Sequence, residues 1–170
     1  NMMGDMCGDE KRKQLFFKDA KFTGTMKRFT KVVETAASRV LPKRVPNDFV
    51  FLLSEGGCAD QHVHMDWDID TWSSSIHDDG VCGGFPVGCL IALEPNTAIN
   101  VWPGSIGFSE DRTYYGERLT LKPGDALLFR ADLVHSGASY SESNLRIHCF
   151  LDRDGLDRIE NDSRFMHDYA

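Results

Sequence analysis

The sequence predicts a mainly β protein, a β-sandwich or small barrel preceded by one amphipathic helix. The first observation is a single apolar stripe over residues 25–41, with spacings of three, four and seven. The second is a series of short apolar or alternating segments over residues 47–151, separated by turn residues such as Pro95-Asn96. Strands that follow one another without intervening helices are not typical of a parallel α/β sheet. A mainly β (α+β) fold is therefore expected, with the helix packed on one sheet.

Each segment of the chain has an expected place in this fold. Residues 1–23 are polar and mixed in charge, and we expect a loosely held arm. The helix over 25–41 should end before Pro42, because proline cannot continue a helix. Strands are expected at 49–53, 62–68, 88–94, 98–102, 118–121, 126–129, 134–138 and 145–151.

The remaining segments lack the periodicity of helices or strands. Residues 67–87 are rich in Gly, Ser and Asp, and a loop of this length in a compact domain is often functional. Because it directly follows the 62–68 strand, we expect it to act as a lid. Residues 152–170 form a polar tail. The chain of 170 residues is therefore expected to be one domain, with a β core over 47–151.

Composition restricts the partners and the compartment. The net charge is −7 and the pI is about 5.3, which disfavours a nucleic-acid partner, since such proteins usually carry a basic stripe. The five cysteines are odd in number and contain no C-x-x-C pair, which predicts a reducing, intracellular compartment. No apolar run is long enough to cross a membrane, so no membrane partner is expected.

Two histidines and one aspartate are the candidate metal ligands. His64 and Asp66 are two residues apart, so on a strand their side chains point to the same side. His135 would come from a neighbouring strand, with the small residues Ser136 and Gly137 after it. Two imidazoles and one carboxylate on one face suit iron(II), with the opposite face open for reactants. His62 shares a face with His64 and is a rival ligand or a neighbour of the site.

Arg146 follows His135 by eleven residues and alternates with the apolar residues Leu145 and Ile147. If those two pack against the helix, then Arg146, and His148 after it, point into the barrel. The planar guanidinium group of arginine can bind a carboxylate through two hydrogen bonds. Arg146 is therefore a candidate for binding a carboxylate inside the barrel.

Residues 49–151 resemble the double-stranded β-helix (jelly-roll, cupin-like) core of the iron(II)- and 2-oxoglutarate-dependent oxygenases. The similar segments are Leu121-Lys122-Pro123-Gly124-Asp125-Ala126-Leu127-Leu128-Phe129, Val134-His135-Ser136-Gly137 and Leu145-Arg146-Ile147. Asn100-Val101-Trp102-Pro103-Gly104-Ser105 is similar to the phytanoyl-hydroxylase-like branch, with Ile106 where that branch often has His. The resemblance implies that His64, Asp66 and His135 bind iron and that Arg146 holds the C5 carboxylate of 2-oxoglutarate.

Two further residues are candidates for contact with 2-oxoglutarate. His148 would share the inward face with Arg146 and could help to hold the co-substrate, or it could be a core histidine. Asn100 and Trp102 share one strand face, so either both lie beside the metal or both point away.

The resemblance implies hydroxylation of a small molecule or a protein side chain by O2, with conversion of 2-oxoglutarate to succinate and CO2. One alternative is an oxidative nucleic-acid demethylase, which would need a basic groove. A second is a cupin-like binding protein or isomerase without oxygen chemistry. Four aspartates in 67–87 favour a neutral or cationic substrate such as an amino acid, peptide or amine, unless that loop is only a solvated acidic segment: Asp68, Asp70, Asp78 and Asp79.

Overall fold

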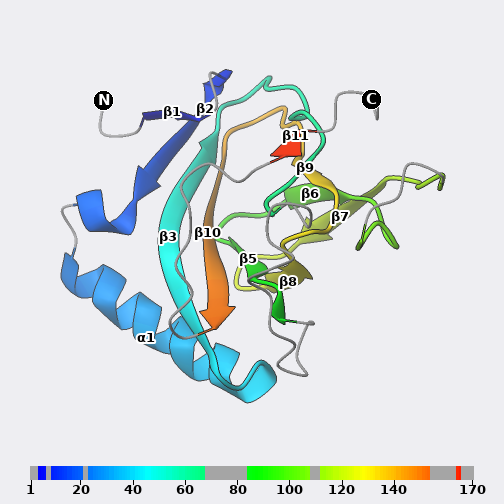
Figure 1. Ribbon diagram of the computed structural model, residues 1–170. Helices are drawn as coiled ribbons and strands as arrows, with labels where there is room; N and C mark the ends of the chain where they lie inside the picture. Colours follow the sequence, from blue (N-terminus) through cyan, green and yellow to red (C-terminus); the bar gives the residue numbers. More distant parts are fainter. Residues whose placement is uncertain are drawn as a thin grey trace.

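The strands form two antiparallel sheets that pack against each other (Figure 1). The computed structural model describes residues 4–6, 9–20, 23–67, 84–107, 112–153 and 164–165. The six-stranded sheet has the order β1 (Gly4–Met6), β2 (Asp9–Phe16), β3 (Arg44–Ser54), β10 (Asn144–Arg153), β5 (Val87–Ala92) and β8 (Ala126–Arg130). The five-stranded sheet has the order β11 (Arg164–Phe165), β4 (His64–Met65), β9 (His135–Gly137), β6 (Thr97–Val101) and β7 (Glu117–Leu121).

An apolar core joins the two sheets. Leu90 of β5 and Phe129 of β8 pack against Ile99 and Val101 of β6. Strand residues alternate between faces, so these contacts define the inner face of each strand. A residue that is the ladder partner of one of these inner-face residues also points inward. His148 of β10 is the ladder partner of Leu90, so the side chain of His148 is on the inner face of β10.

The helix α1 (Thr23–Val40) covers the outer face of the six-stranded sheet, beside β3 in Figure 1. Val33 and Ala37 of the helix pack against Ile147 and Cys149 of β10, which are on the outer face of that strand. The expected helix is confirmed within two residues at its start and one at its end. The apolar stripe of the helix is only partly buried: the side chains of Val32 and Val40 are 66% and 65% exposed.

The N-terminal segment differs from the expected polar arm. Residues 9–16 form β2, and Arg12 to Phe16 pair with β3 from Ser54 back to Val50. The short 3₁₀ turn η1 (Phe17–Asp19) then connects β2 to the helix side of the sheet, where Phe17 stacks on Phe49 with centroids 5.1 Å apart. Sequence alone indicated no strand here because the charged residues of β2 hide its alternation, and its polarity suits a position near the sheet edge.

The described residues show no helix that is long and apolar enough to cross a membrane. Most of the expected lid, residues 68–83, lies outside the described residues, as does most of the tail after residue 153. Two tail residues are described in β11, which pairs with β4 through Arg164 opposite Met65 and Phe165 opposite His64. Trp67, at the start of the expected lid, is buried against Phe85 and Ala131.

Candidate functional site

The short strand β4 and the residue that follows it present His64 and Asp66 on one side. His64 Nδ1 lies 2.8 Å from the carbonyl oxygen of His62, so the imidazole donates its Nδ1 hydrogen there. This hydrogen bond leaves Nε2 of His64 as the nitrogen with a free lone pair, which is the form that binds a metal. Val63 and Met65 point the other way and are buried against Val134. Strand alternation therefore produces the expected arrangement of both candidate ligands.

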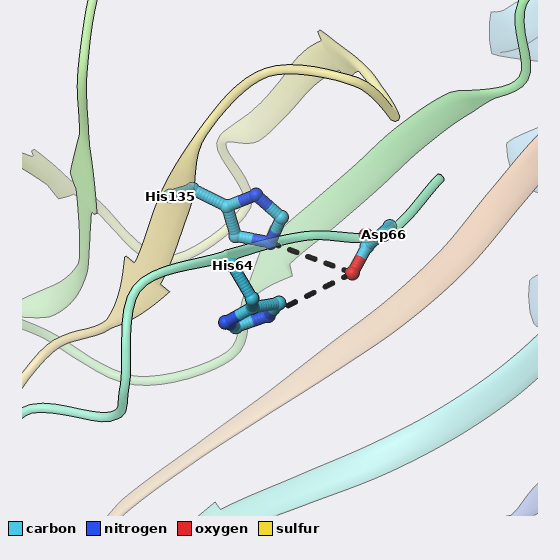
Figure 2. A group of neighbouring side chains, drawn as sticks. All are labelled: His64, Asp66 and His135. Carbon is cyan, nitrogen blue, oxygen red and sulfur yellow. Dashed lines mark ion pairs between the residues drawn. The ribbon is translucent and has the colours of Figure 1, made fainter. Parts of the chain in front are cut away.

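His135 reaches the same point from β9, where it is the direct ladder partner of His64. Its Nδ1 lies 2.9 Å from the carbonyl oxygen of Leu133, so Nε2 again faces the cluster. Nε2 of His135 is 3.5 Å from Asp66 Oδ1, and Nε2 of His64 is 3.8 Å from the same oxygen (Figure 2). One ligand atom from each of the three residues lies within 4.8 Å of the other two.

This spacing fits one metal ion. Ligand atoms about 2.1 Å from an ion are roughly 3 Å apart at right angles and about 4 Å apart on opposite sides. The separations of 3.5 and 3.8 Å fall in this range and are too long for direct hydrogen bonds. Two neutral imidazoles and one carboxylate match the donor set of the non-haem iron(II) sites that react with oxygen. The residues present can therefore hold such an ion.

The surroundings of His64 favour the neutral, metal-binding form of its ring. Burial lowers the pKa of His64, and the nearby His135 lowers it further, while the Asp66 carboxylate acts in the opposite direction. Because the net direction is downward, the ring stays neutral to lower pH than a free imidazole does. His62, the rival ligand from the sequence, is exposed and contributes its backbone carbonyl to the site rather than its ring.

Phe129 of β8 supports the metal cluster from the inner face of the opposite sheet. Its ring centroid lies 4.9 Å from that of His135, in an edge-on arrangement. Gly88 is the ladder partner of Phe129, and a Cβ atom at residue 88 would lie only 2.5 Å from Phe129 Cζ. The absence of a side chain at Gly88 thus creates the space for the Phe129 ring.

Gly88→Ala should push the Phe129 ring towards His135 and disturb the ligand geometry. We expect the free energy of unfolding to fall by about 1–3 kcal/mol, the usual effect of overpacking, together with weaker binding of Mn²⁺. Urea melts and a Mn²⁺ titration measure both quantities. Gly24→Ala in α1 is the matched control, because nothing lies within 4 Å of its added Cβ. The free energy of unfolding of Gly24→Ala should rise by roughly 0.5–1 kcal/mol, and its affinity for Mn²⁺ should not change. Unchanged Mn²⁺ binding in Gly88→Ala would contradict the role of Phe129.

Arg146 lies on the inner face of β10, with Ala92 of β5 and Leu52 of β3 as its ladder partners. Only 3% of its surface is exposed. Its Nη1 donates to Ser54 Oγ at 3.0 Å, and its guanidinium carbon lies 5.4 Å from the Tyr140 ring centroid. Among the described residues, no carboxylate forms an ion pair with it. Burial lowers the pKa of Arg146, Tyr140 raises it, and the neighbouring cation Arg12 lowers it.

A buried guanidinium without a carboxylate partner is an unfavourable arrangement in the free protein. The arrangement becomes favourable when a ligand supplies the anion, because arginine can bind a carboxylate in its plane. Arg146 is two residues before His148 on the same face of β10, a distance of about 7 Å along a strand. His148 Nε2 lies 3.9 Å from Asp66 Oδ2, beside the metal cluster. Arg146 therefore shares one face of β10 with His148, the residue of that strand that borders the metal cluster.

The structure does not bring Asn100 to the cluster. Asn100 is the ladder partner of Ser136 and donates to its hydroxyl at 3.2 Å, whereas the adjacent Val101 is the partner of His135. Asn100 is therefore on the outer face of β6, where its side chain also contacts the Asp60 carboxylate. This position does not support the expected contact with 2-oxoglutarate. Sequence alternation left both faces open, and the pairing of β6 with β9 selects the outward one.

Two polar residues of the inner face had no expected role. Arg12 is 1% exposed and Ser54 is fully buried, and both lie next to Arg146. Arg12 lies in a segment whose polar composition suggested an arm. Ser54 precedes the Gly56-Gly57 turn and belongs to no motif. No local signal in the sequence could have identified either residue.

No protein-family profile and no curated sequence matches the chain. Several solved structures do match its fold. An epimerase, SnoN, solved with Fe³⁺, α-ketoglutarate and nogalamycin RO, is 15% identical with a TM-score of 0.58, over 98% of this chain and 80% of SnoN. HygX from Streptomyces hygroscopicus, solved with nickel and 2-oxoglutarate, is 12% identical with a TM-score of 0.64, over 91% and 74%.

A third similar structure is a prolyl hydroxylase from Trichoplax adhaerens in complex with a peptide of hypoxia inducible factor. It is 14% identical with a TM-score of 0.61, over 91% of this chain and 72% of the hydroxylase. Identities this low establish the fold, and the resemblance seen in the sequence is confirmed at that level. The chain has the double-stranded β-helix fold of the iron- and 2-oxoglutarate-dependent oxygenases and related enzymes.

Proposed function

We propose that the chain is an iron(II)- and 2-oxoglutarate-dependent dioxygenase that hydroxylates a small molecule or a protein side chain. The observation that carries this proposal is the combination of the His64, Asp66 and His135 cluster with the buried Arg146 on β10 of the facing sheet, which has no carboxylate partner among the described residues. A metal cluster alone would suit many binding proteins. The nearby site for a second carboxylate is what selects a 2-oxo diacid as the co-substrate.

His64, Asp66 and His135 would hold the iron on one side, so that the other side is left for the reactants. When bound, iron and 2-oxoglutarate together supply the oxidising chemistry, in which O2 delivers one atom to the substrate and one to succinate, with loss of CO2. Arg146 would bind the distal carboxylate and thereby set the distance of the 2-oxo acid end from the metal. His148, beside Asp66, would border the co-substrate between these two points.

The apolar residues on the inner faces would exclude water from this space. Leu90, Ile99, Val101 and Phe129 are all buried between the sheets beside the cluster. Exclusion of water strengthens the attraction between Arg146 and a bound carboxylate, because the local dielectric constant is lower. These four apolar side chains would also separate the reacting centre from bulk solvent.

The prime substrate is proposed only at the level of its class. SnoN was solved with a small natural product and the prolyl hydroxylase with a peptide, so the fold accommodates both classes. The two enzymes also carry out different reactions, an epimerisation and a hydroxylation. Conversion of 2-oxoglutarate to succinate therefore has to be measured separately from the change in the prime substrate, and hydroxylation predicts a product with one additional oxygen atom.

The test is anaerobic addition of iron(II) and 2-oxoglutarate to the protein, followed by visible absorption spectroscopy. Chelation through the 2-keto oxygen should produce a weak charge-transfer band that succinate, which lacks the keto group, cannot produce. Exposure to air should then release succinate, and more of it when a substrate is present. Metal binding without the band or succinate would instead indicate a cupin-like binding protein and would contradict the proposal.

A further inference from the structure

Two cysteines lie directly opposite each other on the outer face of the six-stranded sheet, beneath α1. Cys89 of β5 is the ladder partner of Cys149 of β10, and their side chains are 2% and 0% exposed. Neither forms a disulfide in the structure, and no step of the proposed function uses them. We propose that Cys89 and Cys149 form a redox-active dithiol, which hydrogen peroxide or a similarly small peroxide converts into a disulfide bond between β5 and β10. This inference does not depend on the proposed function.

The pairing of β5 with β10 brings the two cysteines close to the separation that a disulfide needs. Directly opposed residues of an antiparallel pair have Cα atoms roughly 4.5–5.5 Å apart, and disulfides span Cα separations of about 4.4–6.8 Å. The Cβ atoms are about 4.5–5.5 Å apart in a ladder and about 3.5–4.5 Å apart in a disulfide, so a small approach of the strands is sufficient. The next row on each side is aliphatic: Ile91 with Ile147, and Val87 with Leu151. The bond would therefore form between two apolar rows of the sheet.

The contact between the two thiols makes them chemically unequal. A hydrogen bond with Cys149 lowers the pKa of Cys89, whereas burial acts in the opposite direction. The same hydrogen bond, together with burial, raises the pKa of Cys149. The thiolate is the nucleophile in thiol oxidation, and a thiol that keeps its hydrogen can later supply a proton. Cys89 is therefore the thiol that attacks the oxidant, and Cys149 is the thiol that completes the disulfide.

A groove between α1 and the β8 edge of the six-stranded sheet gives small molecules a route to Cys89. The groove has a volume of about 470 Å³, and Cys89 is one of its lining residues. The other lining residues are apolar and include Val33 of the helix and Leu128 of β8. One water molecule takes up about 30 Å³ of the liquid, so a molecule as small as hydrogen peroxide fits in this space. An apolar wall disfavours charged oxidants, so a neutral peroxide is the class of oxidant that suits the site.

The reaction balances with a peroxide as the oxidant. The Cys89 sulfur attacks one oxygen of hydrogen peroxide, the O–O bond breaks, and the other oxygen leaves as water with the proton that the Cys89 thiol released. The product is a sulfenic acid on Cys89. The Cys149 sulfur then attacks the Cys89 sulfur, the S–O bond breaks, and the hydroxyl leaves as a second water with the thiol hydrogen of Cys149. The two thiols lose two electrons and two hydrogens, and the peroxide gains both.

The test is treatment of the folded chain with hydrogen peroxide in the presence of a metal chelator, which prevents iron-catalysed oxidation. The remaining thiols are then blocked, and the protein is digested with trypsin for mass spectrometry. We expect the peptide of residues 147–153, which carries Cys149 alone, to be joined to the peptide of residues 45–112 with the loss of two hydrogens. Dithiothreitol should release both peptides. The urea midpoint of the oxidised protein should be higher than that of the reduced protein, because the disulfide closes the loop of residues 90–148 in the unfolded chain.

Alanine variants identify which cysteine of the 45–112 peptide takes part, since this peptide contains Cys58, Cys82 and Cys89. Cys89→Ala should not form the link, whereas Cys58→Ala and Cys82→Ala should form it fully. Cys58 is the matched control because it is also buried, at 5% exposed, but its bridge partner is Tyr140 rather than a thiol. Cys149→Ala should leave Cys89 as a sulfenic acid, which dimedone traps as a stable adduct.

Two substitutions on α1 test the route of the oxidant. Ala36 lines the groove, so Ala36→Phe should obstruct it and slow the formation of the disulfide several-fold. Ser38→Phe is the matched control, because Ser38 is exposed on the same helix and does not line the groove. This control should be oxidised at the rate of the unmodified protein. Urea melts under reducing conditions check that both variants are folded.

The outcomes bear on the dithiol alone, because the readout involves neither iron nor 2-oxoglutarate. An unlinked 147–153 peptide in the peroxide-treated, unmodified protein would overturn the inference, as would a link that persists in Cys89→Ala. Loss of the link in Cys58→Ala would also overturn it, because the disulfide would then involve a different pair. Equal rates of oxidation in Ala36→Phe and Ser38→Phe would overturn the assigned route through the groove.

Discussion

Replacement of Asp66 by Ala is expected to abolish succinate formation and to weaken iron(II) or Mn²⁺ binding by more than about 100-fold. Asp66 is the one carboxylate of the cluster, and its Oδ1 is the atom that both histidine Nε2 atoms approach. Loss of residues that only support metal ligands already costs roughly 10–100-fold in affinity, so loss of a ligand should cost more. Metal titration and succinate assays measure the two effects.

Two further variants test the role of the charge in this prediction. Asp66→Asn keeps the shape of the side chain but not the negative charge, and it should fail nearly as completely as Asp66→Ala. Asp60→Ala removes a carboxylate six residues earlier that accepts from the Ser139 backbone on the outer face. The Asp60 variant should retain metal binding and turnover. Normal turnover in Asp66→Ala would show that the metal site has been assigned to the wrong residues.

Replacement of Arg146 by Met is expected to weaken 2-oxoglutarate binding and, at the same time, to raise the stability of the ligand-free protein. Affinity for 2-oxoglutarate should fall by roughly 100-fold or more, because a buried, charge-assisted and bidentate contact is lost. In the ligand-free protein the same change removes a buried cation that has no carboxylate partner among the described residues. The free energy of unfolding should therefore rise, by about 1 kcal/mol or more. Anaerobic titration and urea melts measure the two quantities.

The Arg146 prediction has its own controls. Arg146→Lys keeps the charge but loses the planar fork, so it should bind 2-oxoglutarate weakly and should not gain stability. Mn²⁺ affinity should be unchanged in both variants, because Arg146 contacts none of the three candidate ligands. If Arg146→Met bound 2-oxoglutarate as the unmodified protein does, the anion site would have to lie elsewhere.

Strand alternation was sufficient to predict that the side chains of His64 and Asp66 lie together. A separation of two residues places His64 and Asp66 on one side wherever the strand lies, and this relation holds in the structure. The same reasoning placed Arg146 and His148 opposite Ile147, and Ile147 does pack against the helix. The helix was equally predictable, because its stripe has a period of 3.6 and Pro42 follows it.

Alternation could not decide between the two faces of an isolated strand. Alternation predicted that Asn100 and Trp102 share a face, and it could not say which one. The pairing of β6 with β9 places Asn100 on the outer face of β6. The position of His148 beside Asp66 Oδ2, 3.9 Å away, likewise depends on how the two sheets meet. The polar N-terminal segment becomes a strand only because β3 offers it a free edge.

The sequence by itself predicted the candidate site residues: His64, Asp66, His135 and Arg146. His64 and Asp66 are identified by their residue types and by a two-residue spacing along one strand, and His135 and Arg146 by the resemblance of their segments to the oxygenase core. Only the tertiary structure decided what surrounds them, above all the meeting of Arg12 and Arg146 at Ser54. These residues come from β2, β3 and β10, and their contact depends on ladder register and on inward orientation across two sheets. Local periodicity carries no information about which distant strands become neighbours.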